Sequence, residues 1–551
     1  MEQNQSLHPV LWACYLVVMA VILILYSQSL LTTPYGRFTN DSLNYADVAR
    51  NILRGRGIVQ SAVGFNEAVF SADMPIPMPM TNQPPLYPML VALLAWMQMP
   101  IPTAALLLAA AGMVLVIYCG IYLARLVYGD SAGLLAGIAM LGFAPIHLVG
   151  GRAWSDTLAT GFTLLSLIML VSARRSPGLA VPQLAAAGLA AGLAFAMRYA
   201  VLPLIPVALL ALYRSDDRRC SVRSWEIFLA AAVLIIGLVI GRNLIVDGTL
   251  VGSPRHASTK GLVENLIDTR LAMFGMYIGG PFYWPGLMKL LNIPQEIPAD
   301  QAIQISLAFI AVILIILLLR HKLWDALFAQ QRYLLLTWIG AYMAFLVLQR
   351  TMYHFDNIRA RLAFPASIVL VILLAGLTAY ALSLRPNFVI VPALLLLLYG
   401  VSIAQVEANK PDISQGEFVE RTIVDHPILD WVNKSTTPED LIIGDDPVDV
   451  VFYLNRDSAV SFSPYPYSDH LSYETLTAFL QKHCGNYRNI YLFVRALKSS
   501  EAHWQEEFGP FITDLAMDRT AAYPNIIMRI PHENVLLYQL RCQYTAVSNR
   551  Q

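Results

Sequence analysis

Two acidic residues stand at the expected outer ends of membrane-spanning segments, where a carboxylate can act as an acid or a base. Asp41 follows the first apolar segment, and Asp156 directly precedes a later one. A carboxylate partly shielded from water at the membrane boundary can take a proton from a hydroxyl or an amine. The alternative is a structural role for both residues, because aspartate commonly caps helix N-termini and interacts favourably with the helix dipole.

Arginines gather on the same expected side as the two acids. A planar guanidinium binds two phosphate oxygens at once, so arginine suits phosphate recognition at low dielectric better than lysine. We expect roughly one or two of the set to contact an anionic substrate, whereas others contact lipid headgroups or pair with Asp247 or Asp356. The set is Arg152, Arg198, Arg242, Arg350, Arg359 and Arg361.

Two further hypotheses concern the same side of the membrane. Tyr353 and His354 are candidates to line the site, with the alternative that interfacial aromatic residues serve only as anchors. Asp41 and Asp156 are also candidates to share a divalent cation, Mg²⁺ or Mn²⁺, which would neutralise a leaving phosphate. The sequence contains no other clear cluster of oxygen ligands, so a metal is not certain.

The composition determines what must position these residues. The chain has 551 residues, of which 57% are hydrophobic and 13% are charged. Repeated apolar segments approach the roughly 20 residues that cross a bilayer, which predicts a polytopic α-helical membrane protein. Lys and Arg together number 37, as do Asp and Glu, so the zero net charge gives no reason to expect a nucleic-acid partner.

Hydropathy predicts about 11 to 13 membrane-spanning helices, the first of which is a retained anchor rather than a cleaved signal. Basic loops at 174–175, 214–223, 320–332 and 385 share one side, which the positive-inside rule makes cytoplasmic. The expected segments are 10–31, 102–124, 132–149, 156–172, 180–197, 199–213, 226–246, 302–319, 332–349, 362–383 and 387–404.

This orientation predicts two large outer loops, 32–101 and 247–301, within a membrane domain that covers residues 1–405. In the first loop, residues 42–54 have the apolar spacing of an amphipathic helix, which we expect to lie on the membrane surface. Residues 84–99 begin with a proline pair and are too short to cross alone, so we expect a re-entrant or interfacial segment.

Residues 406–551 have an ordinary globular composition and should form a soluble α/β domain outside the cytoplasm. The expected helices are 414–434, 447–454 and 472–483, and they alternate with strands 440–444, 458–461, 489–495 and 536–540, a pattern typical of a mainly parallel sheet. Cys484 and Cys542 would lie in an oxidising compartment, where they either form a disulfide or remain two separate thiols.

At these residues the chain resembles the polyprenyl-phosphate-dependent GT-C glycosyltransferases, a group that includes protein O-mannosyltransferases and lipid A aminoarabinose transferases. The resemblance covers roughly residues 10–405 and implies a GT-C membrane domain followed by the soluble domain. The matching elements are Asp41 with Tyr45, Ala49 and Gly55-Arg56-Gly57; Gln83-Pro84-Pro85-Leu86-Tyr87-Pro88; Ser155-Asp156; Arg242-Asn243 with Gly248; and Arg359 to Pro365.

The resemblance implies that Asp41 and Asp156 are the catalytic acids and that Tyr45 and Tyr87 line the site. The arginines, Arg350 excepted, would bind the donor phosphate together with Gln83. Family members often have lysine at the position of Gln83, and many have two adjacent acids where this chain has only Asp41. The glutamine in place of lysine and the single acid in place of two both leave open how the donor phosphate is held and whether a metal is required.

The implied reaction is an inverting transfer of a sugar from a polyprenyl-phosphate donor to a protein, lipid or glycan acceptor. It would take place at the extracytoplasmic face of the inner, or cytoplasmic, membrane, with Asp41 as the base. The main alternative is a polytopic transporter or lipid flippase, which usually has ionisable groups near the bilayer midplane and internal repeats. A third alternative treats the membrane part as a scaffold for an external binding domain.

Overall fold

The structure is a computed structural model of the chain. It describes residues 9–32, 38–63, 75–141, 143–175, 180–213, 218–252, 258, 260–269, 332–353, 360–384, 432, 434–444, 451, 456–460, 471–495, 501–517, 519–532 and 535–541. The chain forms two compact units, and each is described by itself. Unit 1 comprises Met1–Arg37, Ala105–Gly241 and Ala257–Gln415, and unit 2 comprises Phe38–Ala104, Arg242–His256 and Gly416–Gln551.

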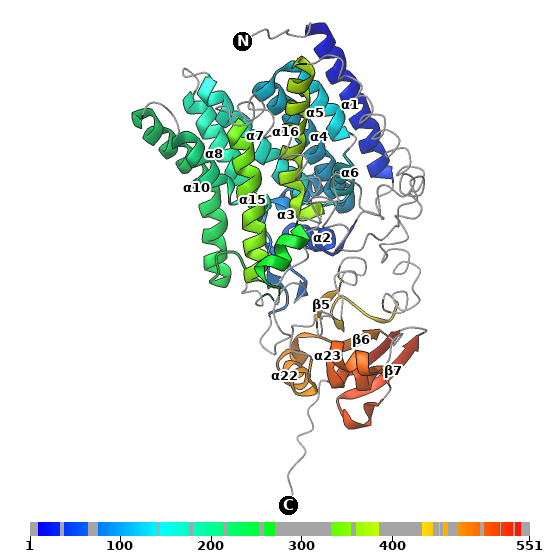
Figure 1. Ribbon diagram of the computed structural model, residues 1–551. Coiled ribbons are helices and arrows are strands. Elements are labelled where there is room, and N and C mark those ends of the chain that lie inside the picture. Colours follow the sequence, from blue (N-terminus) through cyan, green and yellow to red (C-terminus); the bar gives the residue numbers. More distant parts are fainter. Residues whose placement is uncertain are drawn as a thin grey trace, which may run out of the picture. The chain divides into compact units, whose positions relative to one another are not determined.

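Unit 1 is built from long apolar helices (Figure 1). Within the described residues, six helical segments are long and apolar enough to cross a membrane: Ile101–Tyr128, Asp156–Arg175, Ala180–Met197, Val222–Asp247, Arg332–Met352 and Arg361–Tyr380. Full helix bounds are α1 Pro9–Thr32, α4 Ile101–Tyr128, α5 Asp130–Leu141, α6 Ala144–Gly150, α7 Asp156–Arg175, α8 Ala180–Met197, α9 Leu204–Tyr213, α10 Arg218–Asp247, α15 Arg332–Met352 and α16 Ala360–Leu384. The prediction of a multi-pass helical membrane protein is confirmed.

Two expected membrane segments are interrupted by proline. The segment expected at 132–149 is divided into α5 and α6, with Pro145 in the first turn of α6. The segment expected at 199–213 begins with a short 3-10 helix, η3 (Tyr199–Val201), and continues as α9 after Pro203. Proline has no backbone N–H and disfavours helical geometry in the residue before it, so a continuous helix is wrong in both places. The segments expected at 302–319 and 387–404 lie outside the described residues.

Glycines allow helices of unit 1 to approach closely. A Cβ atom on Gly188 of α8 would lie 2.2 Å from the carbonyl oxygen of Phe228 in α10, and one on Gly192 would lie 2.8 Å from the Ile235 Cβ. Small residues four positions apart are typical of packed membrane helices, because lipid supplies no hydrophobic force between helices and close backbone contact must replace it. The close packing of α8 against α10 therefore requires glycine at residues 188 and 192.

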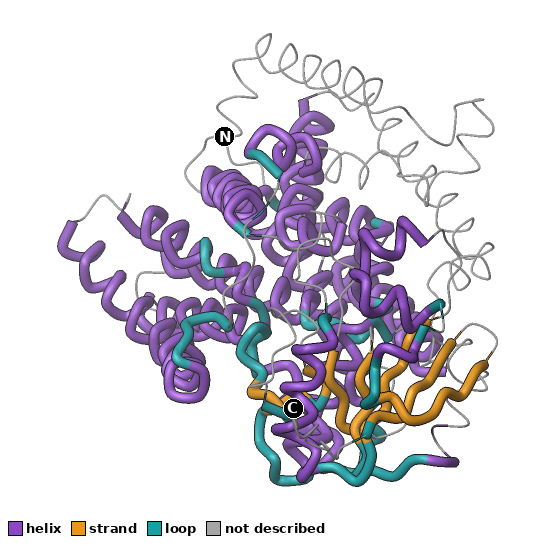
Figure 2. Tube along the Cα trace, turned by 90° about the horizontal axis from the view of Figure 1, so that it is seen from below, coloured by secondary structure: helices purple, strands orange, loops and turns teal. Residues whose placement is uncertain are grey.

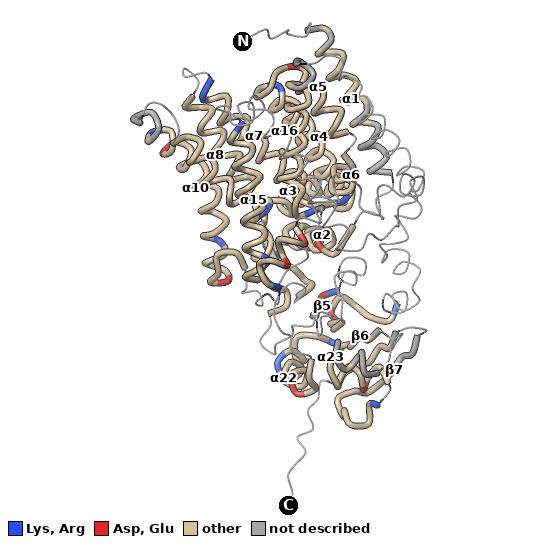
Figure 3. The backbone as a smooth tube through the Cα atoms, viewed as in Figure 1, with Lys and Arg blue, Asp and Glu red and all other residues tan. Residues whose placement is uncertain are grey.

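Charged residues of unit 1 lie mainly toward the ends of its helices (Figure 3). At one end, Arg174 of α7 donates to the Tyr333 hydroxyl at 3.1 Å, and Arg332 of α15 lies over the Tyr128 ring at 4.9 Å. This is the end that the basic loops predict to be cytoplasmic. The N-terminus of α7 and the C-terminus of α8 form the opposite end, where Asp156 lies.

Unit 2 contains a six-stranded mixed sheet, drawn in orange in Figure 2. The strand order is β2-β5-β4-β6-β8-β7; the first four strands are parallel, and β8 and β7 are antiparallel to their neighbours. The bounds are β2 Ala62–Val63, β4 Leu441–Gly444, β5 Asp457–Val460, β6 Ile490–Arg495, β7 Ile526–His532 and β8 Val535–Leu540. Helices α22 (Tyr473–His483) and α23 (Glu501–Ala516) contribute Phe479 and Ile512 to its core.

This sheet confirms the four expected strands and the helix expected at 472–483. The sequence reasoning missed β2, β7 and α23, and the helices expected at 414–434 and 447–454 lie almost entirely outside the described residues. Because β2 lies in segment 32–101, which the sequence predicts to be the first outer loop, unit 2 joins that segment to the C-terminal region, whereas the sequence suggested a boundary at residue 405. Cys484 is disulfide-bonded, and Cys542 is not among the described residues.

The first outer loop also contributes α2 (Asn40–Leu53), α3 (Leu86–Trp96) and a small antiparallel pair, β1 (Val59–Gln60) with β3 (Met78–Pro79). The helix expected at 42–54 is present, but it is not a surface helix: residues on every side of it are buried, among them Asp47 and Asn51. Helix α3, 11 residues long, agrees with the expected short segment at 84–99.

Candidate functional site

Asp156 lies at the centre of an arginine cluster at one end of unit 1. Its side chain is fully buried, and it begins α7. Arg198, at the end of α8, donates to its Oδ1 atom, and the Arg361 Nε, at the start of α16, donates to its Oδ2 atom at 3.1 Å. Both carboxylate oxygens therefore accept hydrogen bonds from guanidinium groups contributed by two other helices.

Trp154 extends this cluster. The Arg361 guanidinium lies 4.2 Å from the centre of the Trp154 ring, and that of Arg152 lies 4.9 Å from it. An arginine over a tryptophan ring is stabilised by the ring quadrupole, more strongly where water is excluded. We call Arg152, Trp154, Asp156, Arg198 and Arg361 the Asp156 cluster; it brings three guanidinium groups together with one carboxylate.

The geometry favours a positioning role for Asp156. A general base must receive a proton from substrate, but both oxygens of this carboxylate are already engaged by cations. The two guanidiniums and the carboxylate hold one another in place. Guanidinium groups held in this way are suited to bind an anion such as phosphate.

Asp41 lies in unit 2, in the first turn of α2. Thr39 is the N-cap residue, so Asp41 is not the cap that the structural alternative predicted. Its Oδ1 accepts a hydrogen bond from the Gln83 side-chain amide at 3.0 Å. Gln83 in turn accepts from Asn44, which also donates to Gln60. We call Asp41, Asn44, Gln60 and Gln83 the Asp41 cluster.

Aromatic contacts hold the helices that carry this cluster. The rings of Tyr45 in α2 and Tyr87 in α3 meet edge to face, with their centres 5.0 Å apart, and both side chains are buried. Edge-to-face pairs add stability beyond that of the buried area. Both tyrosines, expected to line the site, therefore pack helix against helix beside Asp41 and Gln83.

Arg242 binds backbone atoms of the segment expected as the first outer loop. Its guanidinium donates to the carbonyl oxygens of Met80 at 2.7 Å and Ile58 at 2.9 Å, and to the Asn243 side chain. These bonds satisfy backbone acceptors that would be costly to leave unpaired when buried. The expected phosphate ligand thus has a structural role within unit 2, where it binds the carbonyls that flank β1 and β3.

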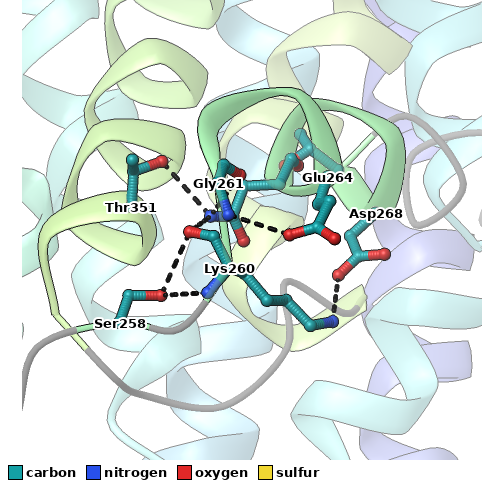
Figure 4. Close-up of polar contacts among 8 residues, drawn as sticks. Ser258, Lys260, Gly261, Glu264, Asp268 and Thr351 are labelled. Carbon is teal, nitrogen blue, oxygen red and sulfur yellow. Dashed lines mark hydrogen bonds and ion pairs between the residues drawn. The ribbon is translucent and has the colours of Figure 1, made fainter.

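The second outer loop is described only in part. A short helix at 262–269 is joined to the end of α15: the Asn265 amide donates to the Thr351 hydroxyl, and the Ser258 N–H donates to the Met352 carbonyl. Lys260 pairs with Asp268 at 2.7 Å (Figure 4). Arg350 and Tyr353 follow in α15 and directly after it, Arg350 buried and Tyr353 half-buried. His354 and Arg359 lie outside the described residues.

A divalent cation does not fit the residues present at Asp156. Each of its oxygens is directed at a guanidinium, and a bound cation would have to displace a like-charged group. Within the part of the chain that the structure describes, no three His, Cys, Asp or Glu side chains are arranged to hold a metal.

Three residues of these clusters were not predicted from the sequence. Asn44 and Gln60 are 2% exposed, and Trp154 is 4% exposed. The spacing of Asp41 and Asn44, three residues apart on one helix, was a signal that the two side chains share a face. Asp47 was also missed: it accepts from the Ser61 N–H at 2.6 Å, and burial raises its pKa to about 6.

Residues 82–241 match the family model of the dolichyl-phosphate-mannose-protein mannosyltransferases. Among solved structures, ArnT from Cupriavidus metallidurans bound to undecaprenyl phosphate matches at a TM-score of 0.57 and 14% identity, over 95% of this chain and 98% of that one. The chain has the GT-C fold. The fold expected from the sequence is therefore confirmed.

The GT-C fold is also shared with the Archaeoglobus fulgidus oligosaccharyltransferase tethered to an acceptor peptide that contains the NVT sequon. That structure matches at a TM-score of 0.52 and 12% identity, over 95% of this chain and 74% of that one. No curated protein matches the sequence. The comparisons support the glycosyltransferase prediction and give no support to a transporter.

Proposed function

We propose that this protein is an integral-membrane glycosyltransferase that moves a sugar from a polyprenyl-phosphate donor to an acceptor hydroxyl or amine. The observation that carries the proposal is the Asp156 cluster at one end of unit 1, in which two guanidiniums bind a single carboxylate and a third lies over the Trp154 ring. Guanidinium groups bind phosphate oxygens well at low dielectric, and a lipid phosphate is an anion available within a membrane.

The comparisons support the class of donor. One similar structure holds undecaprenyl phosphate, and the matched family model is that of transferases using dolichyl-phosphate mannose. A lipid-linked donor also suits a multi-pass membrane protein, since the prenyl chain can remain in the bilayer. The acceptor is a protein, lipid or glycan; the acceptor peptide of the archaeal structure makes a protein one of the three to test.

The reaction proposed is a single displacement at the anomeric carbon. The acceptor oxygen or nitrogen forms a bond to that carbon as the bond to the donor phosphate oxygen breaks, which inverts the configuration. Asp41 takes the acceptor proton, and the departing polyprenyl phosphate carries the electron pair and the negative charge. Arg361, Arg198 and Arg152 stabilise that charge.

The proposal places the chemistry at the extracytoplasmic face of the inner membrane, with the C-terminal region on that side. Arg174 and Arg332 lie at the opposite end of unit 1 from Asp156, as the positive-inside rule requires. The disulfide at Cys484 is typical of an oxidising compartment. A reporter active only outside the cytoplasm, fused after Gln551, should be active; activity of a cytoplasm-only reporter would contradict the orientation.

The test is transfer of radiolabelled mannose from undecaprenyl phosphate to the acceptors of source membranes by the purified full chain. If mannose is not transferred, the other lipid-linked sugars extracted from those membranes are used. We expect Asp41→Asn to lower the transfer rate at least about 100-fold, because removal of a general base has effects of this size. Failure of wild type with every lipid-linked sugar, or full activity of Asp41→Asn, would overturn the proposal.

A further inference from the structure

The Asp41 cluster is a continuous chain of side-chain amides that ends at a carboxylate. The Gln83 Nε2 atom donates to the Asp41 Oδ1 atom at 3.0 Å. The Asn44 Nδ2 atom donates to the Gln83 Oε1 atom at 3.5 Å and to the Gln60 Oε1 atom at 3.2 Å. Asp41 and Asn44 share one face of α2, so the helix directs both side chains at Gln83.

The orientation of each amide follows from the carboxylate. An ionised carboxylate only accepts hydrogen bonds, so Gln83 must turn its amino group to Asp41 and its oxygen to Asn44. Asn44 must then turn its own amino group to Gln83. This orientation leaves the Asn44 oxygen buried without a hydrogen-bond partner among the described residues, which costs free energy. Reversing the amides of both Asn44 and Gln83 would avoid this cost only by placing the Gln83 oxygen against an oxygen of Asp41.

Burial strengthens these bonds. Asn44 and Gln60 are each 2% exposed, so water does not compete for their amide groups. Hydrogen bonds at low dielectric are stronger than in water and polarise one another along a chain. The bond from Gln83 to Asp41 is therefore reinforced by Asn44, and the contact of Tyr45 with Tyr87 keeps α2 and α3 at the required separation.

We propose that Gln83 is a positioning residue for Asp41, and that Asn44 and Gln60 fix the orientation of Gln83. The proposal rests on the role of Asp41 as the base. Gln83 directs the carboxylate by a hydrogen bond that favours its ionised form, yet it adds no positive charge. Asp41 therefore remains a stronger base than it would be beside an ammonium group.

The test is the pH dependence of kcat/KM for mannose transfer from undecaprenyl phosphate, since its acid limb reports the base in the free enzyme. Gln83→Leu removes the hydrogen bond, so the acid limb should move to higher pH and the rate should fall about 10-fold. Gln83→Lys adds a cation beside the carboxylate, so the acid limb should move to lower pH. Asn44→Ala should move it in the same direction as Gln83→Leu, by less.

Asn51→Ala is the matched control, because Asn51 is a second buried asparagine of α2 that binds Ser61 and the Val59 carbonyl instead. It should lower the thermal stability without moving the acid limb. If Gln83→Leu does not fold, Gln83→Lys and Asn44→Ala provide the same comparison. An unchanged acid limb in the folded Gln83 and Asn44 variants, with Asp41→Asn inactive, would overturn the positioning role alone.

A different outcome would exclude Asp41 as the base. Should Asp41→Asn remain active, or should wild type transfer no lipid-linked sugar, the proposed function fails and the positioning role fails with it. The two failures are distinguished by Asp41→Asn, which is measured in the same membranes and over the same pH range as the Gln83 variants.

Discussion

Ala62 lies directly opposite Ser458 in a parallel strand pair, although Ala62 belongs to the first outer loop and Ser458 to the C-terminal region. Arg50 and Arg56 reinforce this pairing: Arg50 donates to the Val451 carbonyl, and Arg56 pairs with Asp457 at 3.4 Å. The same outer loop carries Asp41. The C-terminal sheet is thus built partly from the loop that carries the proposed base, which makes it a support for that loop.

This strand register predicts a specific disulfide. In a chain carrying Ala62→Cys and Ser458→Cys, the two side chains should lie on the same face of the sheet and close enough to cross-link under mild oxidation. Non-reducing peptide mapping should find the 62–458 link. The control pair, Val63→Cys with Ser458→Cys, puts the thiols on opposite faces and should not cross-link; equal yields from both pairs would contradict the register.

The Asp156 cluster predicts a loss of stability when its carboxylate is removed. Asp156→Asn removes the charge of a buried carboxylate that binds two guanidiniums, which should lower the free energy of unfolding by about 3 kcal/mol. The measurement is thermal unfolding in detergent. The double variant Asp156→Asn with Arg361→Gln should recover part of that loss; a double variant less stable than the sum of the singles would contradict the pairing.

The same cluster predicts which arginine affects lipid binding. Arg361→Gln should weaken binding of undecaprenyl phosphate about 10-fold, because a charge-assisted contact to phosphate is lost. Arg332→Gln is the matched control, since Arg332 also lies at the start of a helix but at the opposite end of unit 1. Binding is followed by native mass spectrometry. Equal weakening by both variants would indicate a general charge effect.

The helices were predictable from the sequence, because a run of apolar residues long enough to cross a bilayer has few other structures available to it. The interruptions at Pro145 and Pro203 could have been read from the same residues. The pairing of β2 could not: two residues give no periodicity, and their partner is almost 400 positions away in the sequence. Strand pairing of this kind depends on tertiary contacts that a local pattern does not contain.

The sequence indicated which residues belong to the site, but not which of them contact one another. The arginines and Asp156 were found from their position at helix ends, whereas the pairing of Asp156 with both Arg198 and Arg361 depends on how α7, α8 and α16 pack. Gln83 was found through a motif. Its contact with Asp41 follows from the packing of α2 against α3, which no spacing in the sequence specifies.

Asp47 predicts how the stability of unit 2 depends on pH. Burial raises the pKa of its carboxyl to about 6, well above the ordinary value of 3.8, so the folded state binds this proton more tightly than the unfolded state. The bound proton stabilises the folded state by up to about 3 kcal/mol. This stabilisation is complete below about pH 4 and is lost as the pH rises through about 6. Asp47→Asn stays neutral and should flatten this part of the profile. Thermal unfolding from pH 4 to 8 measures the difference, and parallel profiles would contradict it.

Close packing of α8 on α10 predicts opposite outcomes for two glycines. Gly188→Leu would push a side chain into the Phe228 carbonyl and should destabilise the protein by about 3 kcal/mol, since overpacking forces the helices apart. Gly237→Leu, on the same α10, has nothing within 4 Å of its Cβ position and should be tolerated. Detergent unfolding temperatures compare the two. A larger loss at Gly237 than at Gly188 would show that α10 is packed through a different face, and the contact of these two helices would then have to be reassigned.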